Sequence, residues 1–316
     1  MITNIEIVKY RPEYRKVWND FVESSKNGTF LFNRAYMDYH SNRFEDCSYL
    51  IYNKNKLFCL LPANVRDDIV YSHQGLTYGG LIMNDNCKSE GILQVFESLL
   101  NEFRDKGIKK LVYKPVPYIY SNIPSQEDLY ALFRNNASLT GRNISSTVYL
   151  PDRLSFATLR KRMIKRAKEN DMIIRSSDDL PSFWFLLENN LSEKYGVKPV
   201  HSLEEISLLK SRFPDNIGLY AAYRHEKMLA GVVCYIFKNI VHCQYISANK
   251  EGKESGALDL LFDYLINIEF KEKSYFDFGI SNEEGGRYLN EGLISQKEGF
   301  GGRGVCYDTY EIDLSN

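Results

Sequence analysis

The residues best suited to hold an anion lie directly after an apolar strand pattern in the second half of the chain. The connection Asn249–Ala257 contains two glycines and a serine, and it leads into an apolar helical pattern. A helix N-terminus presents unpaired N–H groups and the positive end of its dipole to an anion. We therefore predict that a pyrophosphate binds here. The predicted ligands are Gly252, Lys253, Ser255, Gly256 and Ala257.

A second polar cluster occupies the segment Glu193–His201, which joins two helical patterns. It brings an acid, two lysines, a tyrosine and a histidine together within nine residues. Loops are polar because they face water, but they also carry a disproportionate share of functional residues. His201 is the preferred general base among the five histidines. Glu193, Tyr195 and Lys198 are the other candidate functional residues of this segment, and a polar linker without a functional role remains the alternative.

Two further candidates lie on strand patterns. Asp277 stands between Phe276 and Phe278, so its side chain points away from both rings. A carboxylate there is either paired or has a shifted pKa, and a structural acid bonded to the following loop is the alternative. Tyr245, in the pattern Ile240–Ala248, could act as an acid or pack as an ordinary sheet tyrosine. Strict alternation puts Val241, Cys243, Tyr245 and Ser247 on one face, opposite His242 and Gln244.

The elements needed to position these residues occur in the same order in both halves of the chain. Each half has two helical patterns, a three-strand meander, a helix and a further strand. In the first half they cover Pro12–Ser25, Asn33–Phe44, Ser48–Tyr52, Leu57–Val65, Ile69–His73, Gly91–Arg104 and Lys110–Lys114. In the second half they cover Asp179–Lys194, Leu203–Arg212, Leu219–Tyr223, Met228–Phe237, Ile240–Ala248, Gly256–Ile268 and Tyr275–Gly279. We expect the final strand to run parallel to the last meander strand and to splay from it, which leaves main-chain groups free for a ligand.

This order predicts an α/β (α+β) fold of two tandem domains, each a mixed, mostly antiparallel sheet flanked by helices. With 316 residues, of which 44% are hydrophobic, the chain is long enough for two domains. We place the domains at residues 1–148 and 149–316, with the boundary near Asn143–Pro151. Between the halves, Ile123–Arg142 has a polar helical pattern, and Ile144–Leu150 has a strand pattern.

Composition limits the partners and cofactors. The net charge of −1 creates no global field toward nucleic acid, so we expect no DNA partner. The six cysteines form no C-x-x-C pair and no histidine lies at metal-ligand spacing, so we expect no metal site. Because no apolar stretch reaches membrane length, we expect no integral membrane association and a cytoplasmic location.

One local segment, Ser155–Glu169, is strongly basic and has the pattern of an amphipathic helix. Its polar arc contains Lys161, Arg162, Lys165, Arg166 and Lys168. This arc is either a solvated face or a contact surface for a phosphate-bearing substrate, a lipid-linked sugar or tRNA. Arg160 falls within the apolar arc, where a guanidinium must find a carboxylate or carbonyl partner or reach into a cleft as a substrate contact.

Several short motifs resemble those of the GNAT acetyltransferase superfamily, and more closely its tandem branch, the FemAB-like acyl- and aminoacyltransferases. They are the meander ending Tyr245–Ala248, the loop Gly252–Ala257, the strand Tyr275–Ser281 and the glycine-rich ending Gly292–Gly301. The family's acyl-CoA loop pattern is approximated by Lys253–Leu258 and by nothing in the first half. The resemblance therefore implies one donor site, in the domain 149–316.

The same resemblance implies roles for individual residues. Main-chain N–H groups around Ile246 and Ala248 would stabilise an oxyanion, and Tyr245 or Ser247 would protonate the leaving group. Lys297 would face the active cleft and hold a carboxylate or phosphate.

The implied activity is N-acyl transfer. An acyl group would move from acetyl-CoA or another acyl-CoA to the amine of a small-molecule or lipid-linked acceptor, such as a cell-envelope or polysaccharide precursor. One alternative is a FemAB-type aminoacyltransferase that uses aminoacyl-tRNA. Another is a catalytically silent relative that binds a glycan or peptide precursor.

Overall fold

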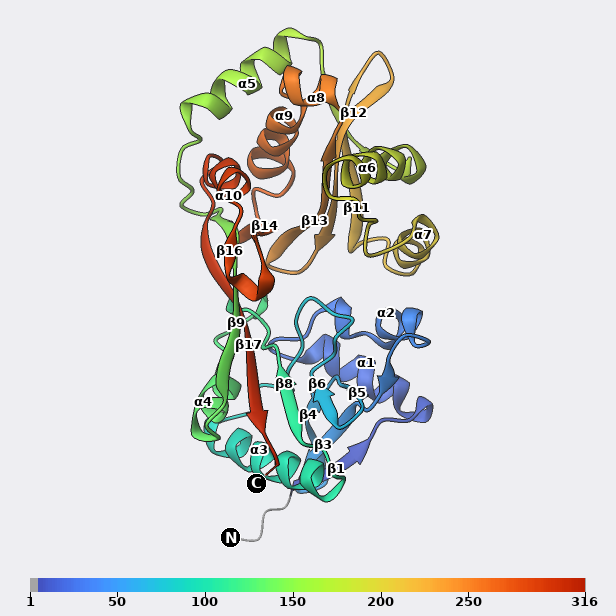
Figure 1. Cartoon of the computed structure of the whole chain (residues 1–316), viewed down its shortest axis with the longest axis vertical. Coiled ribbons are helices and arrows are strands. Elements are labelled where there is room, and N and C mark those ends of the chain that lie inside the picture. Colours follow the sequence, from blue (N-terminus) through green and yellow to red (C-terminus); the bar gives the residue numbers. More distant parts are fainter. Residues whose placement is uncertain (1–4, 316) are drawn as a thin grey trace. The chain divides into compact units, whose positions relative to one another are not determined.

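The computed structural model describes residues 5–315, apart from the side chains of Lys194 and Tyr195, and forms two compact units (Figure 1). Unit 1 comprises Met1–Asn143, Glu284–Tyr288 and Cys306–Asn316, and unit 2 comprises Ile144–Glu283 and Leu289–Val305. Each unit is discontinuous in sequence, because Glu284–Tyr288 and the end of strand β17 (Arg303–Asp313) return to unit 1. Strand β9 (Ser138–Tyr149) spans the first boundary between the units, after Asn143.

The described part of unit 1 contains short strands and four α-helices. The strands are β1 (Ile5–Lys9), β2 (Glu45–Asp46), β3 (Tyr49–Asn53), β4 (Lys56–Leu61), β5 (Asn64–Arg66), β6 (Ile69–Tyr71), β7 (Ile82–Met83) and β8 (Lys110–Tyr113). The helices are α1 (Arg15–Ser24), α2 (Arg34–Met37), α3 (Ser89–Asp105) and α4 (Glu127–Arg134). Strands β1, β3, β4 and β7 form one antiparallel sheet, while β6 pairs with β5 and, in parallel, with β8. Helix α3 buries its apolar face, including Ile92, Phe96 and Leu100, in the core of this unit.

Three sequence predictions for unit 1 need correction. The strand expected at Leu57–Val65 is broken at Pro62 into β4 and β5, which belong to different sheets, because proline cannot donate to a ladder. The helix expected at Asn33–Phe44 is only α2 followed by a single 3₁₀ turn, although Asn33 does cap it by accepting from the Ala35 N–H. The helical pattern Ile123–Arg142 contains only α4, and its last part is already strand β9.

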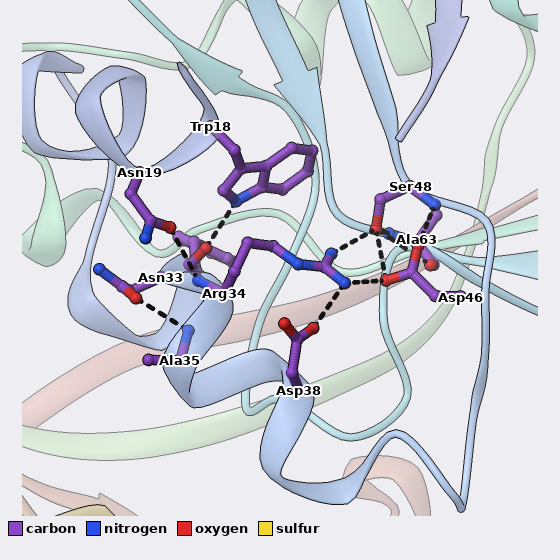
Figure 2. Close-up of polar contacts among 10 residues, drawn as sticks. Trp18, Asn19, Asn33, Arg34, Ala35, Asp38, Asp46, Ser48 and Ala63 are labelled. Atoms are coloured by element: carbon purple, nitrogen blue, oxygen red, sulfur yellow. Dashed lines mark hydrogen bonds and ion pairs between the residues drawn. The ribbon is translucent and has the colours of Figure 1, made fainter. Parts of the chain in front are cut away.

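A buried arginine ties α2 to the strands of unit 1 (Figure 2). The Arg34 guanidinium lies 2.6 Å from an Asp38 oxygen and 2.8 Å from an Asp46 oxygen, and it stacks 3.8 Å above the Tyr10 ring. Its side chain is 5% exposed. Two carboxylates compensate for the loss of water around this cation, which explains how such a residue can begin a buried helix.

Unit 2 has a longer sheet. Its strands are β10 (Ile173–Ser177), β11 (Ile217–Arg224), β12 (Lys227–Ile236), β13 (Ile240–Ala248) and β14 (Tyr275–Ile280), with the short β15 (Asn282–Glu283) and β16 (Tyr288–Leu289). Its helices are α5 (Thr158–Glu169), α6 (Leu180–Tyr195), α7 (Leu203–Arg212), α8 (Lys250–Ser255), α9 (Ala257–Tyr264) and α10 (Glu291–Glu298), and a π-helical turn, Leu265–Glu269, extends α9. The sheet order is β10-β11-β12-β13-β14-β9.

The predicted fold class is confirmed in unit 2. Strands β11, β12 and β13 form an antiparallel meander, α9 crosses over, and β14 returns parallel to β13. Helices α6 and α7 lie on one side of this sheet and α9 on the other (Figure 1). The core between the sheet and α9 includes Val232, Phe262 and Phe276. Among the described residues, no helix is both long and apolar enough to cross a membrane.

Candidate functional site

The parallel strands β13 and β14 separate partway along their length. Their paired residues are Ile240 with Tyr275, Val241 with Phe276 and His242 with Asp277. Beyond this point β13 continues to Ala248, whereas β14 pairs on its other side with β9 at Ile280 and Ser145. The sheet therefore opens directly after the pair His242–Asp277, which confirms the prediction that the two strands splay.

A cavity of about 530 Å³ lies at this opening. Its walls come from β13, β14, the helices α6, α8, α9 and α10, and the turn after α10. The lining residues include Asn190, Glu193, Ile246, Ser247, Ala248, Lys253, Leu258, Phe262, Phe278, Gln296, Lys297 and Phe300. The side chains from α9 are apolar, whereas α6 and α10 contribute both leucines and polar groups.

A β-bulge at Gln244 changes which side chains of β13 share a face. The pairing with β12 shifts there, from Cys234 opposite Cys243 to Val233 opposite Tyr245. Before the bulge, Cys243 packs in the core against α9, and after it Ile246 does so. The predicted grouping of Val241 and Cys243 with Tyr245 and Ser247 is therefore wrong, because one extra residue reverses the alternation. By alternation with Cys243, His242 lies on the α6 side together with Tyr245 and Ser247.

Tyr245 and His201 are in direct contact on that side. The Tyr245 hydroxyl lies 2.5 Å from His201 Nδ1 and accepts the His201 main-chain N–H at 3.2 Å. The ring of Trp184 in α6 packs edge-on against Tyr245, with 5.0 Å between centroids. Burial raises the pKa of Tyr245 to about 12, so the phenol stays protonated at neutral pH and can act as a proton donor.

Ser247 is held by a network that joins three elements. Asn190 of α6 donates to the Ser247 hydroxyl at 2.6 Å and to the Ala248 carbonyl at 2.9 Å. The Lys253 ammonium of α8 donates to the Asn190 side-chain oxygen at 2.8 Å. Asn190 was not a predicted site residue, since an asparagine in a helical pattern carries no distinctive signal.

Asp277 is completely buried and is bonded to a serine, a threonine and a histidine. Its Oδ1 accepts from the Ser145 and Thr147 hydroxyls at 2.5 and 2.8 Å, and its Oδ2 lies 2.7 Å from His242 Nδ1. Burial acts to raise the pKa of Asp277, but His242 and then the two hydroxyls lower it below its usual value. Sequence reasoning missed His242, because strict alternation does not show that the end of the β13–β14 pairing places it beside Asp277.

Lys297 lies at the opening with its side chain nearly buried. Its ammonium donates to the Gly279 and Ile280 carbonyls at 2.8 and 2.7 Å. Burial lowers the pKa of Lys297 to about 8, although Asp277 acts in the opposite direction. A lysine that loses its proton near neutral pH can serve either as a point charge or as a hydrogen-bond acceptor for a substrate.

The predicted pyrophosphate loop is mostly helix α8 in the structure. The Gly252 N–H donates to the Asn249 side chain at 2.7 Å, and the Ser255 hydroxyl donates to the Glu251 carbonyl at 2.6 Å. Gly256 has φ +82°, and a Cβ there would lie 2.4 Å from the Met163 carbonyl oxygen, so this glycine permits α5 to pack on the α8–α9 junction. Ala257 is buried in the core that α5 and α9 form with the sheet. These groups do not form an open cradle for a phosphate.

Arg160 and the residues predicted as substrate contacts come from different elements. The Arg160 guanidinium pairs at 2.8 Å with Asp259 in the first turn of α9, which supplies the carboxylate that its position in the apolar arc requires. Glu193 lines the cavity, and Lys198 is exposed on the loop that follows α6. The side chain of Tyr195 lies outside the described residues. No group of acidic, histidine or cysteine side chains that could hold a metal ion occurs in the part of the chain that the structure describes.

Comparison with known proteins shows similarity of fold at low sequence identity. No protein-family model matches the chain, and no curated protein sequence does. The chain is similar to FemX, with 10% identity, a TM-score of 0.69 and 98% of each chain covered. It is also similar to L-PGS from Bacillus licheniformis, with 11% identity, a TM-score of 0.61, and 95% of this chain and 91% of that chain covered. A tandem GNAT protein from the clavulanic acid biosynthesis pathway matches with 9% identity, a TM-score of 0.52 and 99% of each chain covered. The chain therefore has a tandem GNAT/FemAB-like fold.

Proposed function

We propose that the protein transfers an acyl group from an activated donor to an amine acceptor at the opening between β13 and β14. The observation that carries this proposal is the separation of the two strands after His242 and Asp277, with a cavity of about 530 Å³ at that point. Strands that separate inside a sheet expose main-chain groups within a partly dry site, where they interact strongly with a developing charge. The domain 149–316 holds this donor site, and the domain 1–148 lacks one.

The residues at the opening supply the groups that acyl transfer needs. Main-chain N–H groups of Ile246–Ala248 stabilise the oxyanion that forms when an amine attacks the acyl carbon. Tyr245, kept protonated by burial, donates a proton to the leaving group, and His201 orients its hydroxyl. The Lys297 ammonium and the Lys253–Asn190–Ser247 network hold the polar parts of the substrates.

Two observations favour an aminoacyl ester of tRNA as the donor. The groups of α8 that would bind the pyrophosphate of an acyl-CoA are engaged within the protein. Helix α5 presents the exposed cations Lys161, Arg162, Lys165 and Arg166, which suit an RNA backbone. Acyl-CoA is the second candidate, and the apolar cavity wall of Leu258, Phe262 and Phe300 supports it, because this wall suits a slender thioester arm. Both donors are cytoplasmic, so we place the reaction in the cytoplasm.

The acceptor is proposed to be an amine on a cell-envelope or polysaccharide precursor, either free or lipid-linked. Transfer assays should use radiolabelled aminoacyl-tRNA or acetyl-CoA, with amino-sugar nucleotides and peptidoglycan peptides as acceptors. Label in the acceptor supports the proposal. Binding of an acceptor without transfer from either donor would instead identify a catalytically silent binding protein.

Charge reversal on α5 separates the two donors. The double variant Lys161→Glu/Lys165→Glu should weaken aminoacyl-tRNA binding at least tenfold and reduce its salt dependence, because fewer counterions are released. Acetyl-CoA binding should stay unchanged. Lys271→Glu, which alters an exposed lysine elsewhere in unit 2, is the control. Equal tRNA affinity for the double variant and this control would contradict the proposed RNA contact.

A further inference from the structure

The side chains of His242 and Asp277 meet at the last residue pair before the sheet opens. His242 Nδ1 lies 2.7 Å from Asp277 Oδ2, and the two residues are partners in the parallel ladder. This places a histidine–carboxylate pair at the inner end of the opening. The proposed acyl-transfer chemistry described above makes no use of it.

The contacts of Asp277 hold the ring of His242 in one orientation. Its other oxygen already accepts the Ser145 and Thr147 hydroxyls, and its side chain is fully buried, so the carboxylate has a fixed position. A carboxylate accepts hydrogen bonds and donates none. His242 Nδ1 therefore carries a proton, and in the neutral ring Nε2 has a free lone pair.

The edge of the His242 ring that carries Nε2 lies next to the main chain of Gly279. A Cβ built at Gly279 would be 3.3 Å from Cε1 and 3.9 Å from Nε2 of His242. Gly279 has φ +79° and no side chain to cover that edge, and its carbonyl accepts from Lys297, which lines the cavity. His242 also keeps 12% of its side chain exposed. The ring edge that carries Nε2 therefore lies beside Gly279, whose carbonyl accepts from the cavity-lining Lys297.

We propose that His242 is the general base that takes the proton from the attacking amine, and that Asp277 is its positioning residue. This proposal rests on the proposed acyl-transfer function. In the step, the amine nitrogen bonds to the acyl carbon, and the bond from that carbon to the leaving oxygen or sulfur breaks. His242 Nε2 takes the proton that the nitrogen loses, and the leaving atom takes the proton of the Tyr245 hydroxyl. Proton exchange with solvent then restores both side chains.

The arrangement gives the two histidines of the site different tasks. His201 contacts the Tyr245 hydroxyl through Nδ1, so it serves the group that donates a proton. His242 contacts a buried carboxylate through Nδ1, so it serves as the group that accepts one. Pairs of titratable groups in contrasting surroundings are a common basis for dividing acid and base roles. His201, the base predicted from sequence, is in this account a positioning residue.

The main test compares His242→Gln with the wild-type protein in the transfer assay. Loss of a general base should lower kcat about 10²- to 10⁴-fold while the KM for the donor changes little. Added imidazole should restore part of the activity of His242→Ala, which a purely structural role would not allow. The control is His225→Gln, which changes an exposed turn histidine and should leave kcat unaltered.

A measurement on the wild-type protein keeps the proposal testable if a variant fails to fold. Nitrogen-15 NMR of labelled histidine should show that the neutral ring of His242 carries its proton on Nδ1 and not on Nε2. The opposite tautomer, or an unchanged kcat in folded His242→Gln, would overturn the assignment. Failure of the wild-type protein to transfer any acyl group would instead count against the proposed function, and it would leave the NMR result to decide the orientation of His242.

Discussion

At the scale of single residues, the buried amine of Lys297 makes stability depend on pH. Its pKa of about 8 lies below the usual 10.5, so unfolding takes up a proton between these pH values. The free energy of unfolding contributed by this site therefore rises with pH from 8 to 10.5, by about 1.4 kcal/mol per pH unit at most.

This dependence can be measured by urea denaturation of the wild-type protein and of Lys297→Met. The difference in unfolding free energy between them should increase across that window by up to about 3 kcal/mol. Lys297→Arg is the control, because a guanidinium stays charged and the increase should vanish. A pH-independent difference would mean that Lys297 keeps its ordinary pKa.

Residue-level reasoning from sequence succeeded where a single side chain imposes a requirement. Arg160 in an apolar arc needed either a partner or a cleft, and Asp259 provides the partner, while its role as a substrate contact stays a prediction. It failed for His242, because the relation of that residue to Asp277 depends on where two distant strands stop pairing. It also failed for the faces of β13, since a bulge at Gln244 depends on packing against both β12 and α9 and leaves no local signal.

At the scale of elements, the junction of α8 and α9 is set by a glycine. Gly256 ends α8 in a left-handed conformation, and α5 passes so close that a Cβ would meet the Met163 carbonyl. Gly196 ends α6 in the same conformation, but nothing lies within 4 Å of its Cβ position. The two glycines therefore share a backbone requirement and differ only in packing.

Replacement of each glycine by alanine separates these effects. Gly196→Ala should cost about 1 kcal/mol, the strain of a side chain in this backbone region. Gly256→Ala should cost about 3 kcal/mol, since α5 must also move. Urea denaturation of both variants measures the difference. Similar costs would show that α5 is not tightly packed at the junction.

The order of elements in unit 2 could be predicted from the sequence, because strand patterns joined by short connections are compatible with only a few topologies. The parallel return of β14 and its separation from β13 follow from that order. Helix α8 was not predicted from the sequence, because its glycines suggested a loop. In the structure, the Asn249 cap and the contact with α5 favour a helix. In unit 1, Pro62 was visible in the sequence, but its breaking of one strand into two sheets was overlooked.

At the scale of the whole molecule, each unit contains one of the two tryptophans, Trp18 in unit 1 and Trp184 in unit 2. Both are buried, so the fluorescence of each reports the unfolding of its own unit. The variants Trp184→Phe and Trp18→Phe leave one reporter each. They allow the proposed location of the donor site to be tested.

The donor that supports transfer, aminoacyl-tRNA or acetyl-CoA, should stabilise only the unit that binds it. At a hundred times its Kd it should add about 2.7 kcal/mol to the unfolding transition reported by Trp184. The free energy of the unfolding transition reported by Trp18 should not change. A shift of the Trp18 transition alone would put the donor site in the first half of the chain.

The passage of β17 into unit 1 has a practical consequence for anyone who wishes to express the halves separately. Residues Tyr310–Asp313, at the far end of the chain, pair with β8 along Lys110–Tyr113. A fragment truncated after residue 148 would lose this partner, and β8 would become a bare edge that invites aggregation. A soluble first half should therefore require the last eleven residues, Cys306–Asn316, to be grafted back through a flexible linker.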